Sequence, residues 1–246
     1  MEFPRELMIA LRQAQRVTAL TGAGVSQESG LRTFRDAQDG LWAQYRPEDL
    51  ATPQAFQRNP KLVWDWYAWR REKVYQAKPN PAHYALAEMA KLIPHFTLIT
   101  QNVDGLHQAA GSPNVIELHG NIHRVRCSVC GQVLSHWDQD QDEVPRCTTC
   151  NGLLRPDVVW FGENLPQAEL ESAFEAAQRC ELFFSIGTSG LVQPAASLAY
   201  LAQQHGARIV EINAEKTPLT PFADFSFRGK AGEILPALVK ATFHSL

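Results

Sequence analysis

The sequence predicts an α/β protein with a doubly wound parallel sheet and a smaller inserted domain. Short apolar runs of strand length alternate with longer segments of helical periodicity, and this alternation is typical of a parallel sheet. The first run, 17–20, leads directly into the glycine-rich turn Gly22-Ala23-Gly24-Val25-Ser26. Four cysteines in two pairs lie in a segment without the alternation, which predicts the inserted domain.

The spacing of apolar residues places the elements along the chain. A first helix is indicated by apolar residues at helical spacing, namely Phe3, Leu7, Leu11 and Ala14. Further helices are expected over 166–179, where Pro166 suits the first turn, and over 193–205, which Gly206 ends. Buried strands are expected at 17–20, 96–100, 115–118, 182–186 and 208–212.

Two segments interrupt this order. Residues 41–88 read as helices only, and residues 123–152 carry the cysteines. We expect these two insertions to form the small domain together. The large Rossmann-like domain is then discontinuous and comprises residues 1–40, 89–122 and 153–246.

Composition and charge restrict the class of protein. The 246 residues are 45% apolar and 20% charged, as in an ordinary globular protein with one sizeable core. The 23 basic and 26 acidic side chains give a net charge of −3, so we expect no nucleic acid and no anionic membrane as partner. The first residues lack the pattern of a signal peptide, and no apolar run has membrane-spanning length. We therefore expect a cytoplasmic protein, and we expect it to be a monomer.

The cysteine pairs predict a metal site. Cys127-x-x-Cys130 and Cys147-x-x-Cys150 have the spacing of a zinc ribbon, in which two knuckles supply four thiolates to one ion. Four sulfur ligands leave no open position, so the zinc ion is expected to be structural. The alternative, a pair of disulfides, is disfavoured in a chain without an export signal. The fifth cysteine, Cys180, precedes a buried strand and is expected in the core.

A nucleic-acid-binding ribbon is the other alternative for this segment. Its basic residues are balanced by acidic ones, so no basic surface is available to meet phosphate. The residues concerned are Arg124, Arg126 and Arg146 against Asp138, Asp140, Asp142 and Glu143.

Polar residues follow several of the predicted strands. Gln101, Asn102 and Asp104 come directly after 96–100, and His119 follows 115–118. Carboxyl ends of parallel strands line the place where open α/β sheets hold their ligands. The glycine-rich turn after the first strand is expected to present backbone N–H groups to a pyrophosphate, although Gln27 replaces the third glycine of the usual dinucleotide pattern. An ordinary turn between strand and helix is the alternative.

In this order, the motifs resemble those of the sirtuins, which are NAD-dependent protein-lysine deacylases. The matching residues are the Gly-Ala-Gly-x-Ser turn, Phe34-Arg35, Gln101-Asn102-x-Asp104, His119-Gly120, the four cysteines, Gly187-Thr188-Ser189 and Glu211-Ile212-Asn213. The resemblance runs nearly end to end. It implies NAD as cofactor, one structural zinc ion, and transfer of an acyl group from protein lysine that releases nicotinamide and O-acyl-ADP-ribose.

The resemblance also assigns roles to single residues. His119 is implied as the general base that deprotonates a ribose hydroxyl, a task that suits imidazole because its ordinary pKa lies near working pH. A purely structural histidine at a strand end is the alternative.

Five further residues are implied around the reacting ribose. Asn102 and Asp104 would hold nicotinamide, Gln101 would contact the ribose, Phe34 would shield its C1′ carbon, and Arg35 would lie near the phosphates. A capped turn is the alternative for Asn102 and Asp104. The residues implied along the dinucleotide are Gly22, Ala23, Gly24, Ser26, Gly187, Thr188, Ser189, Asn213 and Ala231; Ser189 could instead cap the following helix.

A Tyr-x-x-Arg pair suggests the acyl group. Tyr67 and Arg70 lie three residues apart in a helical stretch and can share one face, where a phenol and a guanidinium would bind a carboxylate. Together with the small Ala51, the pair resembles the class III, bacterial desuccinylase and demalonylase branch of the sirtuins, which also removes acetyl groups. The alternative is an amphipathic helix with packed aromatic rings and solvated arginines. Arg71 is also within helical reach of Tyr67, so the choice of Arg70 rests on the resemblance alone, and we assign Arg71 to the solvated face.

The resemblance implies that the acyl-lysine protein or peptide binds as an added strand between the domains. Trp160 would wall the lysine tunnel together with its neighbours. The implied substrate-binding residues, besides Tyr67, Arg70 and Ala51, are Val159, Phe161, Gly162, Glu163 and Val192.

Two other function classes compete with this interpretation. A dehydrogenase would use the same sheet for hydride transfer, but it predicts an acidic residue about twenty positions beyond the turn, where Leu41 and Trp42 stand near Asp36 and Asp39. A non-catalytic reader of NAD or acyl-lysine would not need His119 together with Asn102 and Asp104.

Overall fold

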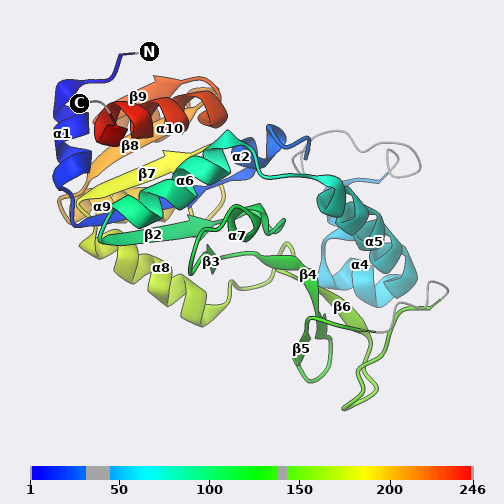
Figure 1. The fold of residues 1–246 in the computed structure, drawn as a ribbon. Helices are drawn as coiled ribbons and strands as arrows, with labels where there is room; N and C mark the ends of the chain where they lie inside the picture. The colour runs from blue at the N-terminus through cyan, green and yellow to red at the C-terminus, as the bar shows by residue number, and fades with distance from the viewer. Residues whose placement is uncertain (1, 32–44, 138–142, 245–246) are drawn as a thin grey trace.

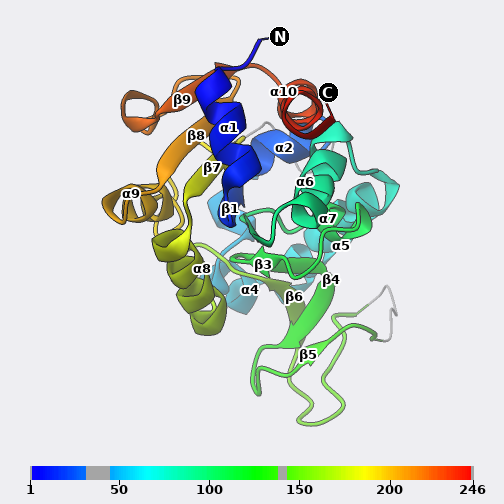
Figure 2. The same ribbon diagram turned by 60° about the vertical axis from the view of Figure 1, so that its left-hand side comes forward.

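The computed structural model describes residues 2–31, 45–137 and 143–244. The chain forms a large α/β unit and a smaller module that projects from it (Figure 1). Figure 2 shows both termini beside α1 (Arg5–Gln13) and α10 (Ala231–Val239), on the side away from the small module.

The large unit is built on a six-stranded sheet in the order β3-β2-β1-β7-β8-β9, with every pair of neighbours parallel. Counted within this sheet the order is 3-2-1-4-5-6, which is the Rossmann order. Its strands are β1 (Arg16–Thr21), β2 (His95–Thr100), β3 (Ile116–Glu117), β7 (Leu182–Ile186), β8 (Arg208–Asn213) and β9 (Phe225–Arg228). The predicted doubly wound sheet is confirmed. The edge strand β9 was not predicted, because it is four residues long and only Phe225 in it is buried.

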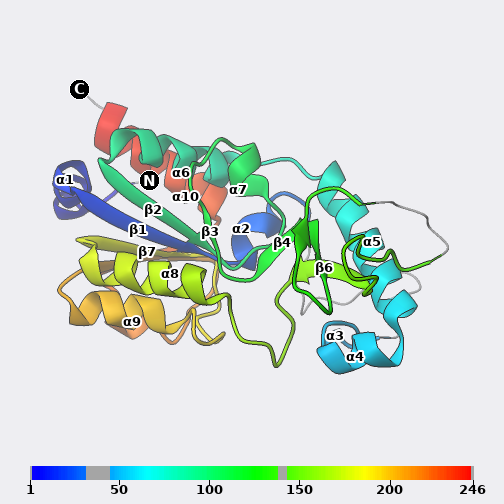
Figure 3. The same cartoon turned by 90° about the horizontal axis from the view of Figure 1, so that it is seen from below.

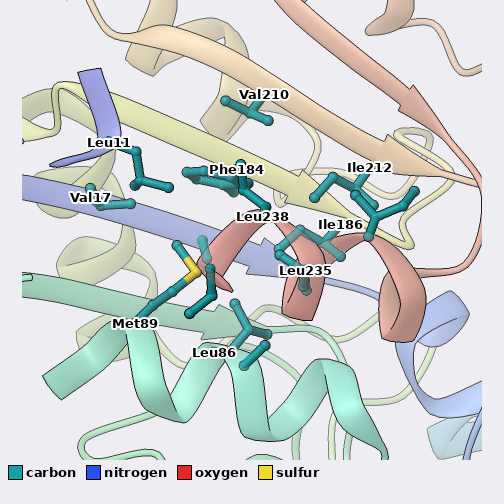
Figure 4. Packing of buried hydrophobic residues seen from close by; sticks show 14 of the residues in the cluster. Leu11, Val17, Leu86, Met89, Phe184, Ile186, Val210, Ile212, Leu235 and Leu238 are labelled. Atoms are coloured by element: carbon teal, nitrogen blue, oxygen red, sulfur yellow. The ribbon is translucent and has the colours of Figure 1, made fainter. Parts of the chain in front are cut away.

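Helices cover both faces of the sheet. Figure 3 shows α6 (Pro81–Leu92) and α10 on one face and α8 (Gln167–Arg179) and α9 (Ser197–Gln204) on the other. The first face forms an apolar cluster in which Leu86 and Met89 meet Leu235 and Leu238 against Phe184 of the sheet (Figure 4). The second cluster packs Phe183 and Ile209 against the alanine-rich faces of α8 and α9. The outcome is a three-layer α/β/α core.

Helix α6 belongs to the core of the sheet. Asn80 caps its first turn, and the buried residues Ala82, Ala85 and Leu86 lie in the same cluster as α10. The boundary that we expected at residue 88 therefore passes through this helix.

Helix α9 begins later than predicted. Residues 193–196 form turns, with the Ser197 N–H donating to Pro194 O, and the helix starts at Ser197. Short helical segments complete the large unit: α2 (Ala23–Gln27), α7 (Leu106–Ala109), the 3₁₀ turn Thr220–Phe222 and the π-helical turn Lys240–His244.

The small module combines helices with a second sheet. Its antiparallel sheet has the order β5-β4-β6, with β4 (Gly120–Cys127), β5 (Val133–Leu134) and β6 (Leu154–Val158). Its helices are α3 (Pro47–Leu50), α4 (Pro53–Arg58) and α5 (Pro60–Gln76). Trp66 and Val63 of α5 are fully buried in one cluster with Ile122 of β4 and Val158 of β6. In the described ranges, no helix is both long and apolar enough to cross a membrane.

Candidate active site and metal centre

The candidate site lies where the strand order of the large sheet reverses direction. Strand β1 pairs with β2 on one side and β7 on the other, and Thr21 stands in register with Thr100 and Ile186. The turns that follow these three strands therefore meet at one level of the sheet. Such a switch point is where open α/β sheets bind their ligands.

Three glycines allow two of these turns to pack closely. A Cβ atom on Gly24 would lie 2.8 Å from Gly187 Cα, and one on Gly22 would lie 2.8 Å from Gly187 O. The N–H groups of Gly22 and Gly24 donate to Ile186 O at 3.0 Å and to Gly187 O at 2.8 Å. These two N–H groups are therefore used in contacts with the strand and turn of β7, and this close packing explains both glycines. Binding of a pyrophosphate at the turn stays a prediction.

A continuous hydrogen-bond network joins α2 to the turn after β2. Asn102 Nδ2 donates to Gly22 O and to Ser26 Oγ, both at 2.9 Å. Ser26 Oγ in turn donates to Asp104 Oδ2 at 2.6 Å. The other carboxylate oxygen of Asp104 accepts from Leu106 N at 2.9 Å, so Asp104 also caps a turn. Four of the predicted cofactor residues, Gly22, Ser26, Asn102 and Asp104, are thus brought together, and the side chains of the last three are held in one orientation.

His119 is held with one ring nitrogen engaged. Its Nδ1 lies 2.9 Å from Gln101 O, and because a carbonyl oxygen only accepts, Nδ1 carries the proton. Burial lowers the pKa of His119, and the bond to Gln101 O opposes this in part. A neutral imidazole with its proton on Nδ1 keeps the Nε2 lone pair for accepting a proton. This is the state that a general base requires.

The turn after β7 is tied to its neighbours. Gln101 Nε2 donates to Thr188 Oγ1 at 3.1 Å, and Asn213 Nδ2 donates to Thr188 O at 3.0 Å. Ser189 is exposed and accepts from Leu191 N at 3.4 Å. Because α9 begins only at Ser197, the alternative that Ser189 caps the following helix is wrong.

Of the other predicted cofactor residues, Ala231 lies within the described part of the chain, whereas two lie outside it. Ala231 is buried at the start of α10, next to Gly232, whose N–H donates to Glu28 Oε1 at 2.9 Å. Phe34 and Arg35 lie outside the described residues.

The four predicted metal ligands converge. The Sγ atoms of Cys127, Cys130, Cys147 and Cys150 all lie within 4.8 Å of one another. The Cys127–Cys150 and Cys130–Cys147 sulfur distances are 3.4 and 3.8 Å, close to the roughly 3.8 Å between sulfurs bound tetrahedrally to zinc at about 2.3 Å. None of these cysteines forms a disulfide, so the four thiolates fit one structural zinc ion. Cys180 lies apart from them and is buried, as predicted.

A profile of the Sir2 family matches residues 22–194, well over half of the chain. The chain belongs to the Sir2 family. It is 53% identical over 241 residues to the "NAD-dependent protein deacylase" of Pyrococcus furiosus, covering 96% of each chain.

Solved structures agree with the sequence match. A "Sir2 homolog-NAD complex" superposes with a TM-score of 0.92 at 50% identity, covering 98% of this chain and 94% of the other. A "Sir2-p53 peptide-NAD+" structure gives a TM-score of 0.86 at 33% identity, with 99% and 100% covered. The Sir2 chain thus shares the fold of proteins that were crystallised with NAD and with a peptide.

Tyr67 and Arg70 of the Sir2 chain both belong to α5. Tyr67 is buried, and its hydroxyl accepts a 3.0 Å hydrogen bond from Trp160 Nε1. Burial raises the pKa of Tyr67 to about 12, while the positive charge of Arg70 opposes this rise. Burial lowers the pKa of Arg70, and the charges of Tyr67 and Asp104 oppose that change. The guanidinium charge therefore interacts with both the phenol and Asp104, a candidate cofactor residue.

Arg71 is not on a solvated face, and that expectation is wrong. Its side chain is only 6% exposed, and Nε donates to Ile122 O at 3.0 Å. The guanidinium carbon lies 5.5 and 4.8 Å from the ring centres of Trp64 and Trp137. Helical periodicity could not show this, because two of these partners, Ile122 of β4 and Trp137 of the ribbon segment, come from outside α5.

The turn 159–163 connects His119 to the small module. Val159 N donates to His119 O at 2.9 Å, and Phe161 N donates to Ala51 O at 3.0 Å. The Glu163 carboxylate is committed internally, because it pairs with Arg155 at 2.5 Å and accepts from Trp160 N at 2.8 Å. Three of the predicted substrate residues, Phe161, Gly162 and Val192, are exposed.

One site residue was missed from the sequence. His123 Nε2 lies 2.9 Å from Asp104 O and so supports the turn that carries Asn102 and Asp104. No spacing pattern connects His123 with this turn, since the contact arises only where β4 leaves the large unit.

Proposed function

We propose that this Sir2 protein uses NAD to remove acyl groups from protein lysines, with succinyl and malonyl groups as substrates besides acetyl. The products are nicotinamide, O-acyl-ADP-ribose and the free lysine. The observation that carries the reaction type is the neutral imidazole of His119, which has its proton held on Nδ1 by Gln101 O. The printed names of relatives, "NAD-dependent protein deacylase", support the same class.

Each residue of the network has a definite task in this reaction. NAD, when bound, supplies a leaving nicotinamide and the ADP-ribose group that accepts the acyl group. Asn102 and Asp104 are already oriented by Ser26, so they can hold a carboxamide without rearranging. His119 Nε2 accepts the proton of a ribose hydroxyl, and the developing imidazolium is stabilised by the Nδ1–H bond to Gln101 O.

The acyl selectivity rests on Tyr67 and Arg70. A succinyl or malonyl group ends in a carboxylate, which a phenol and a guanidinium can bind together. Ala51 joins this pocket to the turn 159–163 through the bond from Phe161 N, and its small side chain leaves room for the acyl chain.

The substrate peptide binds as an extended strand beside this turn. The exposed side chains of Phe161 and Val192 offer apolar contacts on either side of such a strand, and Gly162, with φ of +86°, has open space at its Cβ position. Backbone pairing of this kind tolerates many sequences. A structure named for a peptide and NAD+ in the same family supports this mode.

The test is incubation of the purified protein with NAD and one lysine peptide, carrying an acetyl, malonyl or succinyl group in turn. Chromatography should show nicotinamide and the free lysine peptide in equal amounts. Growth of absorbance from reduced nicotinamide would instead indicate a dehydrogenase, and absence of free nicotinamide would indicate a binding protein.

A further inference from the structure

Two buried histidines lie in contact behind the candidate nicotinamide residues. His83 of α6 and His107 of α7 have ring centroids 4.7 Å apart and side chains that are 0% and 1% exposed. Within the described residues, no hydrogen-bond partner reaches His83 Nε2 or His107 Nδ1. The proposed reaction uses neither ring directly, so their place in the site requires a separate explanation.

Both rings are neutral at physiological pH. Burial, together with the neighbouring His83, lowers the pKa of His107 to about 3. Burial also lowers the pKa of His83, although Asp104 opposes this change. Each ring therefore carries a single N–H.

The hydrogen bonds fix which nitrogen carries that proton. Asn80 N donates to His83 Nδ1 at 3.2 Å, so the His83 proton is on Nε2. His107 Nε2 lies 2.9 Å from Thr21 Oγ1, which itself donates to Thr100 Oγ1 at 2.9 Å. Because the Thr21 hydroxyl has one proton, it accepts from His107, whose proton is then also on Nε2. The two remaining nitrogens, His83 Nε2–H and His107 Nδ1, are a donor and an acceptor on touching rings.

The chain of bonds ends at the cofactor site. Thr100 Oγ1 accepts from the Asn102 backbone N–H at 3.0 Å, and Thr21, Thr100 and both histidines are buried. The Asn102 side chain then contacts Gly22 O and Ser26 Oγ. A continuous chain of hydrogen bonds thus runs from His107 through the hydroxyls of Thr21 and Thr100 to the backbone N–H of Asn102.

We propose that His107 is a positioning residue for Asn102, acting through the ordered hydroxyls of Thr21 and Thr100. The inference rests on the proposed function, in which Asn102 holds nicotinamide. Without the Nε2–H of His107, the Thr21 hydroxyl can turn, for example toward Ile99 O at 3.5 Å, and Thr100 loses its fixed orientation.

The test compares His107→Leu, which removes both ring nitrogens, with His107→Gln, whose amide can still donate toward Thr21. We expect His107→Leu to weaken nicotinamide inhibition and to raise KM for NAD by about tenfold, because one orienting hydrogen bond is lost. In His107→Gln, both constants should return most of the way to their wild-type values. Turnover at saturating NAD should change less than KM. His95→Leu, at the exposed start of β2, is the matched control and should leave both constants unchanged.

Thr21→Val tests the hydrogen-bond chain from His107 to Asn102 if His107→Leu does not fold. Thr21→Val should raise the inhibition constant of nicotinamide and the KM for NAD, whereas Thr21→Ser should not. Nitrogen-15 spectra of the wild-type imidazoles should show His107 neutral and protonated at Nε2 at pH 5.

The inference is overturned if His107→Leu and Thr21→Val keep wild-type nicotinamide inhibition, if Gln and Leu behave alike, or if His107 carries its proton on Nδ1. Failure of the wild type to release nicotinamide would overturn the proposed function instead. In that case the nitrogen-15 spectra would still show whether His107 carries its proton on Nε2, as the hydrogen-bond chain requires.

Discussion

The indole of Trp160 donates a 3.0 Å hydrogen bond to the hydroxyl of Tyr67, joining the turn 159–163 to α5. The hydroxyl accepts from Trp160, so its own proton is directed elsewhere. With a pKa raised to about 12, Tyr67 keeps that proton at any physiological pH. In the proposed acyl pocket, Tyr67 can therefore donate to the same carboxylate that Arg70 is expected to bind.

This relationship predicts the effect of a double substitution. Tyr67→Phe with Arg70→Met should reduce kcat/KM for succinyl and malonyl peptides by some hundreds-fold, because a carboxylate buried without partners costs several kcal/mol, at about 1.4 kcal/mol per decade. The kcat/KM for the acetyl peptide should stay similar or increase, since an acetyl group carries no charge that would be left without a partner. Kinetics on one peptide with each acyl group decides the matter, and equal losses on all three substrates would contradict the proposed selectivity.

A matched control must remove a cation from the same helix without disturbing the fold. Lys73 is exposed on α5, so Lys73→Met should leave all three activities unchanged. Arg71→Met is unsuitable, because Arg71 is buried.

Arg71→Met should instead lower stability. The substitution leaves the buried Ile122 carbonyl without its donor and removes the contacts of the guanidinium with the rings of Trp64 and Trp137. We expect a loss of about 2–4 kcal/mol in the free energy of unfolding, since an unsatisfied buried group costs about 1–3 kcal/mol and cation–π contacts add to it. Denaturant unfolding checks this value. An unchanged midpoint would show that the Arg71 contacts contribute nothing to the fold.

His119→Ala should fold and bind NAD but lose deacylation. The substitution removes the base and leaves the Asn102, Ser26 and Asp104 bonds in place. One general base contributes about 10²–10⁴-fold in rate. Calorimetry for NAD and single-turnover product analysis separate binding from chemistry, and near-normal turnover would rule out this role of His119.

The pH dependence of the wild type should reflect the environment of His119. The base works in its neutral form, and burial lowers its pKa below the ordinary value of 6.5. Activity is therefore retained as pH falls below 6.5 and is lost only at the lower pKa of His119. A profile of kcat/KM against pH shows this acidic limb directly. An acidic limb above pH 6.5 would contradict the assignment.

Zinc should be present at one ion per chain and should support the small module. Cys127 and Cys147 belong to a buried cluster with Trp64 of α5, so Cys127→Ser or Cys150→Ser should lower the melting temperature and solubility. NAD binding should be affected less. At about 3.3 Å per residue, the extended stretch of β4 from His119 to Cys127 spans up to roughly 26 Å. Metal analysis of native protein checks the stoichiometry, and a protein without zinc would contradict the prediction.

The sequence by itself determined the α/β class, the strands β1, β2, β7 and β8, the cysteine site and the identity of most candidate site residues. These features depend on local physics: apolar periodicity, turn residues, and ligand types at fixed spacing. The order of motifs along the chain was sufficient to indicate the family, which the Sir2 match then confirmed.

Only the tertiary structure decided which neighbours these residues meet. It placed Gly24 against Gly187, Arg71 against Ile122 and His107 against Thr21, each across 50 residues or more of chain. Such contacts depend on how separate elements pack, and no periodicity within one element encodes them. For the same reason the sequence misjudged Arg71, since the exposure of a helix face is set by the partner that covers it.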